Sequence, residues 1–406
     1  MELVVQKYGG TSLATAEQIK RVARRIIAKR KSGDQVVVVV SAMGNSTSDL
    51  VELARGLSSN PDPREMDLLL STGEIVSGAL TAMALKDLGC DSISLTGAQA
   101  GIHTDTTFGR ARIAALHPER LQRELNQDRV VVVAGFQGVT DEMEVTTLGR
   151  GASDTTAVAL AAGLGAIRCE IYTDVGGIYT ADPRIVKKAQ KLPDISYDEM
   201  LELASYGAKM HPRSIELGEM YQIPILVASA FNENPGTLIH GDVDMMELRN
   251  KVRGVACDLN VARITVLAVP DQPGIAASLF EPLAQAGISV DVIVQNASQE
   301  HLTDLSFTVA QTDLDKALIV VERVAKSIGS PGVVSNDHLG KVSIVGRGIQ
   351  NAPGYASQMF QTLYAEDINI EMITTSEIRI TCIVAESQAH DAVKALHRAF
   401  GLEEPS

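Results

Sequence analysis

The sequence predicts an α/β protein in which a doubly wound, mostly parallel sheet is followed by two βαββαβ units. Up to about residue 240, short Val- and Ile-rich runs alternate with helical stretches, and several runs are apolar on consecutive residues, as in strands buried on both faces. Further on, one sequence pattern occurs twice. The expected strands cover residues 3–6, 36–41, 92–96, 130–134, 169–173 and 224–228, and the clearest helices cover 14–30, 66–88 and 154–164.

The first expected strand runs directly into a turn with two adjacent glycines, Gly9 and Gly10. Glycine lets the backbone approach a ligand closely, and the helix that follows presents unpaired N–H groups at its positive end. Together with the ammonium group of Lys7 and the hydroxyls of Thr11 and Ser12, this turn favours a bound phosphate. The spacing is neither that of a P-loop nor G-x-G-x-x-G, so an ordinary strand–helix turn is the alternative from this motif alone.

A second glycine-rich turn surrounds Arg150, which is suited to hold a carboxylate through two parallel hydrogen bonds. Ser153 and Asp154 follow at the start of a helix. They are either simple N-caps, a role worth ~1 kcal/mol, or site residues, with Asp154 ordering Lys7 or a magnesium-bound phosphate. Because ligands collect beyond the carboxyl ends of parallel strands, two such turns on one sheet favour the functional interpretation.

Two further segments carry candidate ligand contacts. Glu74 is expected in the first turn of a helix, where it either complements the helix dipole or faces a bound ammonium group. The segment 172–184 begins at a strand end and continues as a polar loop, a common position for functional residues. In this loop Tyr179 and Arg184 suit stacking on a flat base, and Asp174 suits a ribose hydroxyl or a magnesium-linked water.

The repeat lies in the C-terminal part of the chain. Residues 271–280 align with residues 351–360, and both copies contain a Pro-Gly pair that ends in Gly274 or Gly354. Each copy predicts a strand, a Pro-Gly turn, a helix, two strands and a helix, which is a βαββαβ unit. The repeat is either a duplicated packing module, with Pro-Gly as capping chemistry, or a pair of amino-acid pockets, and we favour the pockets.

The composition points to a soluble globular protein without a nucleic-acid partner. The length of 406 residues allows two or three domains, and a net charge of −14 leaves little room for a dominant basic face. The four cysteines form no C-x-x-C pair and the eight histidines show no ligand spacing, so we expect no disulfide and no structural zinc. The longest aliphatic run, 36–40, is too short to cross a bilayer, and no signal-peptide pattern precedes the first strand. We therefore predict a cytoplasmic protein without a membrane partner.

In combination, the motifs resemble aspartate kinase (aspartokinase), and the repeat resembles the tandem, ferredoxin-like ACT regulatory domains of that family. The resemblance covers nearly the whole chain and rests on residues 7–12, 71–74, 149–156, 172–174 and 207–212. It implies an amino-acid-kinase fold and Mg2+-dependent transfer of the ATP γ-phosphate to the β-carboxylate of L-aspartate. The product would be 4-phospho-L-aspartate, the entry to lysine, threonine, methionine and diaminopimelate synthesis. The implied domains are a catalytic domain at 1–244, a linker at 245–260, and ACT domains at 261–338 and 339–406.

The resemblance also implies a role for individual residues. Lys7 would stabilise the transferring phosphoryl group, and Asp154 would organise Lys7 and its neighbours. The implied substrate-binding residues are Thr47, Glu74, Arg150 and Ser153. Of these, Arg150 would hold the α-carboxylate of the substrate and Glu74 its ammonium group. The implied ATP-binding residues are Lys7, Tyr8, Gly9, Gly10, Ser41, Thr173, Asp174, Tyr179, Arg184 and Lys209. No side chain is expected to bind the metal directly, because Mg2+ would be carried by ATP. One departure is Ala152, where the family usually has glycine.

For regulation, the resemblance implies inhibition by lysine, threonine or both at interfaces between ACT domains. The implied effector-binding residues are Asp271, Gly274, Ile275, Ala276, Asp291 and Gln295 in the first copy, and Asn351, Ala352, Gly354, Tyr355, Asn369 and Thr374 in the second. Asp291 and Glu371 occupy matched positions and either bind an effector ammonium group or end a strand. We expect a homo-oligomer, or an assembly with a separate regulatory subunit that starts near Met245.

Two other functions compete with this interpretation. The first is a sister kinase that acts on glutamate, N-acetylglutamate or carbamate. Glu74 and Arg150, which suit a free amino acid, and the tandem ACT units argue against it. The second is a non-catalytic amino-acid sensor, for which Lys7, Asp154 and the nucleotide loop would be unnecessary.

Overall fold

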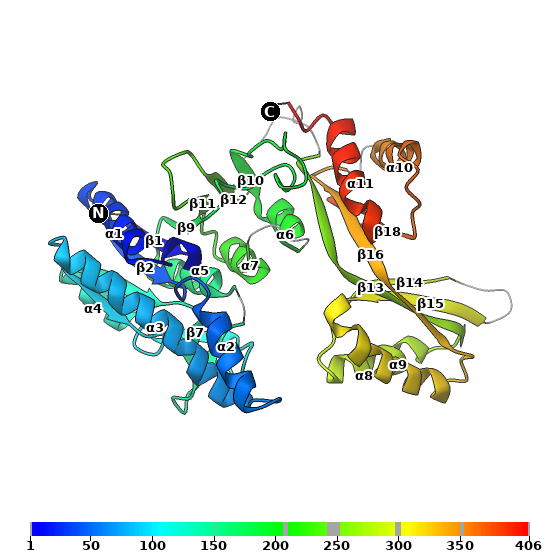
Figure 1. Ribbon diagram of the computed structural model, residues 1–406, viewed down its shortest axis with the longest axis horizontal. Coiled ribbons are helices and arrows are strands. Elements are labelled where there is room, and N and C mark those ends of the chain that lie inside the picture. Colours follow the sequence, from blue (N-terminus) through cyan, green and yellow to red (C-terminus); the bar gives the residue numbers. More distant parts are fainter. Residues whose placement is uncertain are drawn as a thin grey trace. The chain divides into compact units, whose positions relative to one another are not determined.

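A computed structural model describes residues 2–149, 151–205, 210–241, 252–296, 302–349 and 353–404 (Figure 1). These residues form two compact units. The first unit contains the described residues of Met1–Tyr179 and Lys191–Leu248, and the second contains those of Thr180–Gln190 and Arg249–Ser406. The predicted site residues that lie outside the described residues are Arg150, Lys209, Asn351 and Ala352, and the proposed internal start near Met245 lies outside them as well.

The first unit is built on an eight-stranded sheet with the order β10-β12-β11-β9-β1-β2-β6-β3. Neighbouring strands are parallel except β11 and β12, so the predicted doubly wound, mostly parallel sheet is confirmed. The six predicted strands agree with the structure to within two residues. The strands are β1 Leu3–Tyr8, β2 Gln35–Val40, β3 Ser92–Leu95, β6 Val130–Ala134, β9 Arg168–Thr173, β10 Asp194–Ser196, β11 Ile225–Ser229 and β12 Thr237–His240.

Helices cover both faces of this sheet. On one face α1 (Ala16–Lys31) and α3 (Pro63–Asp87) pack against each other and against the strands. On the other face α5 (Ser153–Leu164) packs against β1, β2 and β9. Because successive side chains of a strand point to opposite faces, Gln6 and Tyr8 face α1, whereas Lys7 faces α5. The other helices of the unit are η1 Gly10–Ser12, α2 Ser46–Leu57, α4 Glu119–Asn126, α6 Tyr197–Ser205 and α7 Pro212–Met220.

Among the described residues, α3 is the one helix that is long and apolar enough, by length and composition, to cross a bilayer. In its most apolar window, 44% of the residues are buried inside the protein, and the helix packs against β3, β6, α1 and α2. Its outer face exposes Leu68, Ile75, Val76 and Met83. The sequence predicted this helix at residues 66–88 but did not mark it as a possible span, because Ser, Thr and Gly residues interrupt its aliphatic runs. We interpret α3 as a core helix with an unusually apolar outer face.

A second, four-stranded sheet in the first unit has the order β5-β4-β7-β8. The sequence did not predict it, because each of its strands is only three or four residues long and the pair that joins its two halves, β4 and β7, links segments more than 30 positions apart. The strands are β4 Ile102–Thr104, β5 Ile113–Leu116, β7 Gln137–Val139 and β8 Val145–Thr147.

The second unit contains one six-stranded sheet with the order β14-β15-β13-β16-β18-β17. Two long antiparallel strands, β13 (Gly254–Pro270) and β16 (Val333–Val345), form its centre (Figure 1). The helix pair α8 and α9 belongs to one half of the sheet, and the pair α10 and α11 to the other. The remaining elements are α8 Ile275–Gln285, β14 Val290–Gln295, β15 Leu302–Val309, η2 Gln311–Asp313, α9 Leu314–Ser327, α10 Tyr355–Ala365, β17 Met372–Thr375, β18 Arg379–Ala385 and α11 Glu386–Ala399.

The two repeat copies share their central strands instead of forming separate sheets. β16 ends the first copy and begins the second, and residues 254–258 of β13 pair with residues 341–345 of β16. The first half of β13 therefore takes the place of the fourth and last strand of the βαββαβ unit, which the second copy lacks. Residues 254–260, which the sequence assigned to a linker, are part of this strand, and the predicted boundary between residues 338 and 339 falls inside β16.

Residues 180–190, which the sequence assigned to the catalytic domain, pack within the second unit. Ala181 and Val186 are buried in the same apolar cluster as Val342 and Leu396. The hydroxyl of Thr180 lies 2.8 Å from a ring nitrogen of His397, and both side chains are buried. The loop that follows β9 is therefore divided between the two units.

Candidate active site

The centre of the candidate site is an ion pair at the carboxyl end of β1. The ammonium nitrogen of Lys7 lies 2.5 Å from Oδ1 of Asp154, which is in the first turn of α5. Lys7 is only 9% exposed and Asp154 only 6%. The sequence predicted that Asp154 orders Lys7, and the structure brings these two side chains together. A fixed carboxylate holds a buried ammonium group in one orientation, so that the cation is already positioned to bind an anionic ligand.

The predicted glycine turn follows this lysine and ties three strand ends together. The N–H of Gly9 donates to the carbonyl of Tyr172 at 3.1 Å, and the N–H of Ser41 donates to the carbonyl of Tyr8, also at 3.1 Å. A Cβ on Gly10 would lie 2.5 Å from the carbonyl oxygen of Ala42, so only glycine fits there. The turn therefore brings the ends of β1, β2 and β9 together beside Lys7, and Ser41, which the resemblance implies as an ATP contact, follows the end of β2 there.

Glu74 lies in the middle of α3, not in a first turn as the sequence predicted, because the helix already begins at Pro63. The side chain is 3% exposed, and its Oε1 accepts a hydrogen bond from the N–H of Ala42 at 3.0 Å. Burial raises the pKa of Glu74 to about 7, although the bond from Ala42 opposes this effect. Its Oε2 is buried and has no hydrogen-bond partner among the described residues. Glu74 therefore presents an unpaired acceptor oxygen next to the end of β2.

The second glycine-rich turn precedes α5. Gly149 (φ 94°) and Gly151 (φ 82°) have left-handed backbone conformations that favour glycine. Ala152 has φ −76° and ψ 5° and is fully buried, so its methyl group causes no backbone strain. Ser153, a predicted substrate contact, is buried at the first position of α5. Arg150 lies outside the described residues.

Three residues that the sequence analysis missed support this turn. Asp67 of α3 is 1% exposed and accepts hydrogen bonds from the N–H groups of Gly109 and Thr147, each at 2.8 Å. Arg213 of α7 donates to the carbonyl of Leu148 at 2.8 Å. His211 caps α7, and burial lowers its pKa. The sequence shows Asp67 only as one of several charged residues in α3, and its burial and its partners follow from the assembled fold.

The predicted nucleotide loop begins at the end of β9. The hydroxyl of Thr173 donates to Asp174 at 3.1 Å, and Tyr179 forms an isolated β-bridge with Lys191 in the first unit. Arg184 belongs to the second unit, where its guanidinium binds the carboxylate of Asp182. Thr47, a predicted substrate contact, lies near the start of α2 and is partly exposed.

In the second unit, the two Pro-Gly turns have matched geometry. Gly274 (φ 94°) precedes α8 and Gly354 (φ 112°) precedes α10, and both are left-handed. Tyr355 begins α10 and stacks on Phe400 at a ring-centroid distance of 6.1 Å. Ile275 and Ala276 begin α8, Asp271 precedes its turn, Gln295 ends β14, Asn369 precedes β17, and Thr374 lies in β17.

The matched acidic residues Asp291 and Glu371 already have cationic partners. Asp291 of β14 forms an ion pair with Lys341 of β16. Glu371 forms one with Arg263 of β13, with 2.8 Å between Nη1 and Oε2. An effector ammonium group at either carboxylate would have to share it with, or displace, the existing partner.

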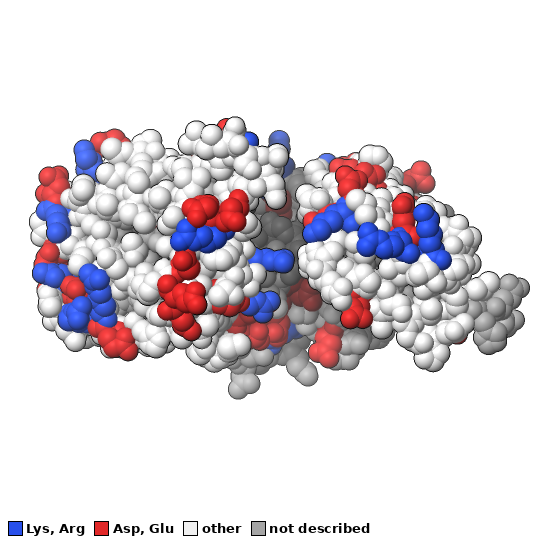
Figure 2. All heavy atoms as spheres, turned by 90° about the horizontal axis from the view of Figure 1, so that it is seen from below, with Lys and Arg blue, Asp and Glu red and all other residues white. Residues whose placement is uncertain are grey.

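Charged side chains are distributed without segregation on the face shown in Figure 2, where acidic and basic groups alternate among uncharged residues. Among the described residues, no group of three or more His, Cys, Asp or Glu side chains is arranged to hold a metal ion.

Comparisons with known proteins agree on one family. Residues 2–229 match the model of the amino acid kinase family, and residues 267–324 and 342–400 match an ACT domain model. An aspartokinase of Bacillus sp. (strain MGA3) is 49% identical over 403 residues, which cover 99% of this chain and 98% of that protein. An aspartokinase of Mycolicibacterium smegmatis is 48% identical over 99% of this chain and 97% of its own length.

Solved structures give the same result. The crystal structure of Escherichia coli aspartokinase III in complex with aspartate and ADP has a TM-score of 0.85 and 27% identity, and the match covers 98% of this chain and 99% of that one. The complex of the same enzyme with lysine and aspartate has a TM-score of 0.75, also at 27% identity, over 98% and 100% of the two chains.

Proposed function

The chain belongs to the amino acid kinase family, as an aspartokinase with two ACT domains, and on this premise we propose how its residues carry out and regulate the reaction. The enzyme transfers the γ-phosphate of ATP to the β-carboxylate of L-aspartate and produces 4-phospho-L-aspartate, the first step in the synthesis of the aspartate-family amino acids. The observation that carries this assignment is the buried ion pair of Lys7 and Asp154 beside the glycine turn, in a chain related to aspartokinases over its whole length.

Phosphoryl transfer proceeds through a loose transition state whose charge is spread over the phosphoryl oxygens, so positioned cations and backbone donors do most of the work. Lys7 is the cation that stabilises this charge, and Asp154 holds its ammonium group in place. Gly9 and Gly10 let the backbone approach the phosphates, with Ser41 at their border. Thr173, Asp174 and Tyr179, together with Arg184 and Lys209, bind the nucleotide.

For the acceptor, Glu74 binds the ammonium group of L-aspartate, and Arg150 binds its α-carboxylate. The geometry of Glu74 supports this role, because its buried Oε2 has no partner in the described residues and an ammonium group would provide one. Thr47 and Ser153 assist in the same pocket. The β-carboxylate is then left to attack the γ-phosphate next to Lys7.

Mg2+ enters with ATP, and no group of three or more His, Cys, Asp or Glu among the described residues is arranged to hold it. The donor chemistry fits this role, because Mg2+ commonly binds through substrate phosphates and one or two carboxylates. Asp154, which is paired with Lys7, and Asp174, which directly follows β9, are the carboxylates that would contact the metal through water. When bound, Mg2+ neutralises charge on the β- and γ-phosphate oxygens.

Lysine, threonine or both inhibit the enzyme by binding at the ACT domains, near the left-handed turns that contain Gly274 and Gly354. Residues beside these turns provide the effector pocket. Inhibition requires only that the effector binds an inactive arrangement more tightly than the active one.

The enzyme works in the cytoplasm as an oligomer. The exposed apolar face of α3 and the exposed Ile293 and Ile373, at matched positions of the edge strands β14 and β17, provide surfaces for subunit contacts. A shorter regulatory subunit that starts near Met245 is an alternative partner for these edges.

The test is ADP release by the purified full-length chain with MgATP and L-aspartate. Lysine and threonine are then added separately and together, and L-glutamate and N-acetylglutamate replace aspartate as acceptor controls. Aspartate-dependent turnover that falls with an effector supports both proposals. Turnover with glutamate or N-acetylglutamate but not with aspartate would favour a sister kinase, and nucleotide binding without turnover would favour the sensor. Turnover that ignores both effectors would refute the assigned regulation while leaving the kinase intact.

A further inference from the structure

A cavity of about 620 Å³ lies on the α1 face of the first unit, the face opposite to that of Lys7. Its volume falls within the range typical of small-molecule sites, about 300–1,000 Å³. One wall is formed by α1 and the other by the segment that follows β11, and Gln6 and Tyr172 also line the cavity. The lining includes four cationic side chains and a single acidic one: Arg21, Arg24, Arg25, Lys29 and Glu233.

The cationic side chains gather because of their spacing on α1. Residues three, four and eight positions apart lie along one face of a helix, so Arg21, Arg24, Arg25 and Lys29 form a row. From Arg21 to Lys29 this row extends about 12 Å at 1.5 Å per residue. The opposite face of α1 is buried and apolar, with Val22 and Ile26 in the core. The row therefore borders the cavity along about two turns of helix.

Two of the arginines are held in place by neutral partners. Arg25 donates to the carbonyls of Ser229 at 2.8 Å and Asn232 at 2.6 Å, and its guanidinium carbon lies 4.5 Å from the ring centroid of Tyr172. Arg21 donates to the carbonyl of Phe231. These contacts fix the guanidinium groups but leave their positive charges without a carboxylate, and each arginine has five N–H donors.

The other two cations differ from each other. Lys29 lies 2.7 Å from a carboxylate oxygen of Asp34 and 3.8 Å from one of the buried Glu170, so its charge is already balanced. Arg24 is exposed and has no hydrogen bond or ion pair within the described residues. Three guanidinium groups thus border one cavity, and no carboxylate of the described residues is bound to any of them, in a chain whose net charge is −14.

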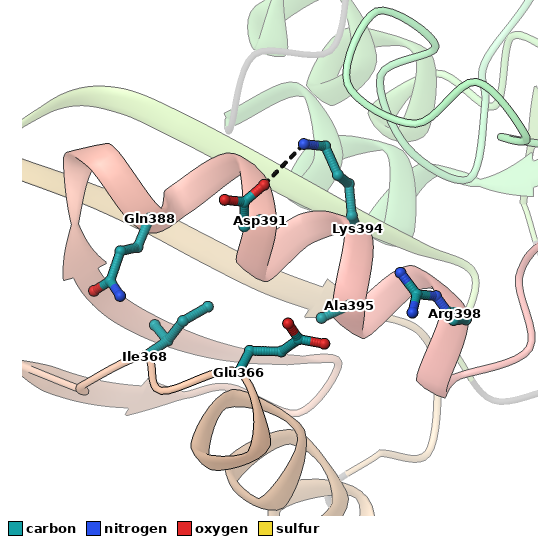
Figure 3. A pocket seen from close by; sticks show the side chains of 7 residues that line it. All are labelled: Glu366, Ile368, Gln388, Asp391, Lys394, Ala395 and Arg398. Carbon is teal, nitrogen blue, oxygen red and sulfur yellow. Dashed lines mark hydrogen bonds and ion pairs between the residues drawn. The ribbon is translucent and has the colours of Figure 1, made fainter.

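A smaller cavity in the second unit provides a contrast. Its volume is about 170 Å³, and it is lined by Glu366, Asp391, Lys394 and Arg398 among others (Figure 3). Acidic and basic groups are balanced there, and Lys394 is bound to Asp391 at 2.8 Å. This balanced lining favours neither anionic nor cationic ligands, whereas the mostly cationic lining of the α1 cavity favours anionic ligands.

We propose that the α1 cavity is a binding site for a small polyanion, a molecule that carries two or more phosphate or carboxylate groups. The planar fork of arginine matches both kinds of group through paired hydrogen bonds. Arg21 and Arg25 provide a prearranged wall, and Arg24 provides a cation that is free to close on the ligand. A site of this kind is separate from the phosphate-binding turn, because Lys7 points to the other face of the sheet.

The test is isothermal titration calorimetry of the full-length chain at low ionic strength, with pyrophosphate and, separately, citrate as probes. We expect binding by at least one probe that weakens as NaCl is added. Arg24→Ala should weaken it about tenfold, the loss of one charge-assisted contact, and Arg24→Lys should lose less. Arg398→Ala, which removes an exposed arginine from the smaller cavity, is the matched control and should change nothing.

A Lys7→Ala variant separates this site from the active site. Binding that persists in Lys7→Ala but weakens in Arg24→Ala supports the proposal, and the probe that binds identifies phosphate or carboxylate as the recognised group. Absence of binding by both probes, equal binding by Arg24→Ala and the wild type, or loss of binding in Lys7→Ala would each overturn it. Circular dichroism and unchanged aspartate-dependent turnover verify that Arg24→Ala is folded.

Discussion

Glu74 offers the sharpest test of the proposed site, because its role in substrate binding should reduce the stability of the ligand-free enzyme. The substitution Glu74→Gln preserves the shape of the side chain and an acceptor for the N–H of Ala42, but it removes the ionisable group. A carboxylate with an unpaired, buried oxygen is costly when it is charged, and a neutral amide avoids this cost.

The size of the effect follows from the pKa. The pKa of Glu74 is raised from an ordinary value of 4.5 to about 7. At about 1.4 kcal/mol per pH unit, this difference corresponds to about 3 kcal/mol. Because the folded-state pKa is the higher one, the associated stability is fully present below pH 4.5 and is lost as the pH rises through 7. Glu74→Gln should therefore be more stable than the wild type by up to about 3 kcal/mol at pH 8 and by less than about 1 kcal/mol at pH 5.

The assay is thermal unfolding of both proteins between pH 5 and pH 8 without ligands. For a unit of this size, 1 kcal/mol shifts the Tm by about 2–4 °C, so the Tm gap should widen by several degrees from pH 5 to pH 8. Added L-aspartate should raise the Tm of the wild type much more than that of Glu74→Gln, because only the carboxylate attracts the ammonium group. In kinetics, the variant should show a KM for aspartate that is higher by at least tenfold.

Two results would refute this reasoning. Parallel Tm curves over the whole pH range would mean that Glu74 does not titrate differently in the folded state. A Tm gap that widens with pH while the KM for aspartate is unchanged would agree with the raised pKa of Glu74. It would contradict the assignment of Glu74 as the ligand of the substrate ammonium group.

The remaining predictions concern the proposed catalytic lysine, the glycine-rich turn before α5, and the two Pro-Gly turns of the ACT domains. Lys7→Ala should lower kcat by at least about 10²-fold with an unchanged circular dichroism spectrum, and near-normal ADP release would contradict its role. Gly149→Ala should lose about 1–2 kcal/mol of stability in urea titration because φ is 94°, whereas Ala152→Gly, at φ −76°, should lose no more than about 1 kcal/mol; equal losses would contradict the strain argument. Gly354→Val should weaken inhibition by lysine or threonine more than it lowers kcat, with Gly274→Val as the matched variant; unchanged inhibition in both would exclude the Pro-Gly turns as effector contacts.

The sequence predicts the parallel sheet well because its signal is local. Strands such as β2 and β6 consist almost entirely of valine and are buried on nearly every residue, so composition and length alone identify them. The start of α3, expected at residue 66 and found at residue 63, also carries a local signal. Asp62 accepts hydrogen bonds from the N–H groups of Arg64 and Glu65, and Pro63 occupies the first helical position, which together form a strong N-terminal signal. The sequence placed the start of this helix at residue 66, so the expectation that Glu74 lies in a first turn conflicted with the predicted helix and was wrong.

The shared strands of the second unit were not predictable in this way. Residues 254–258 pair with residues 341–345, so the partner of this stretch lies more than 80 positions away. An alignment of the two repeat copies does not reveal that they share β13 and β16, because it treats each copy as a complete unit. The same limit applies to Asp67, whose hydrogen-bond partners are Gly109, in a loop, and Thr147, at the end of β8. Local patterns identify elements, whereas pairings between distant segments depend on the assembled fold.

The distribution of unsatisfied polar atoms independently supports the location of the site. Nearly all buried polar side-chain atoms in folded proteins have hydrogen-bond partners, so exceptions tend to mark places where a ligand supplies the missing partner. Among the described residues of the first unit, most buried side-chain atoms with neither a hydrogen bond nor an ion pair belong to the phosphate-binding turn, α3 and the starts of α5 and α7: Ser12, Glu74, Thr155 and His211. The exception is Arg120 in α4. If these atoms were simple packing defects, they would be scattered through the sheet and its helices. Their concentration at the carboxyl ends of the strands is what a site that is completed by ATP and aspartate requires.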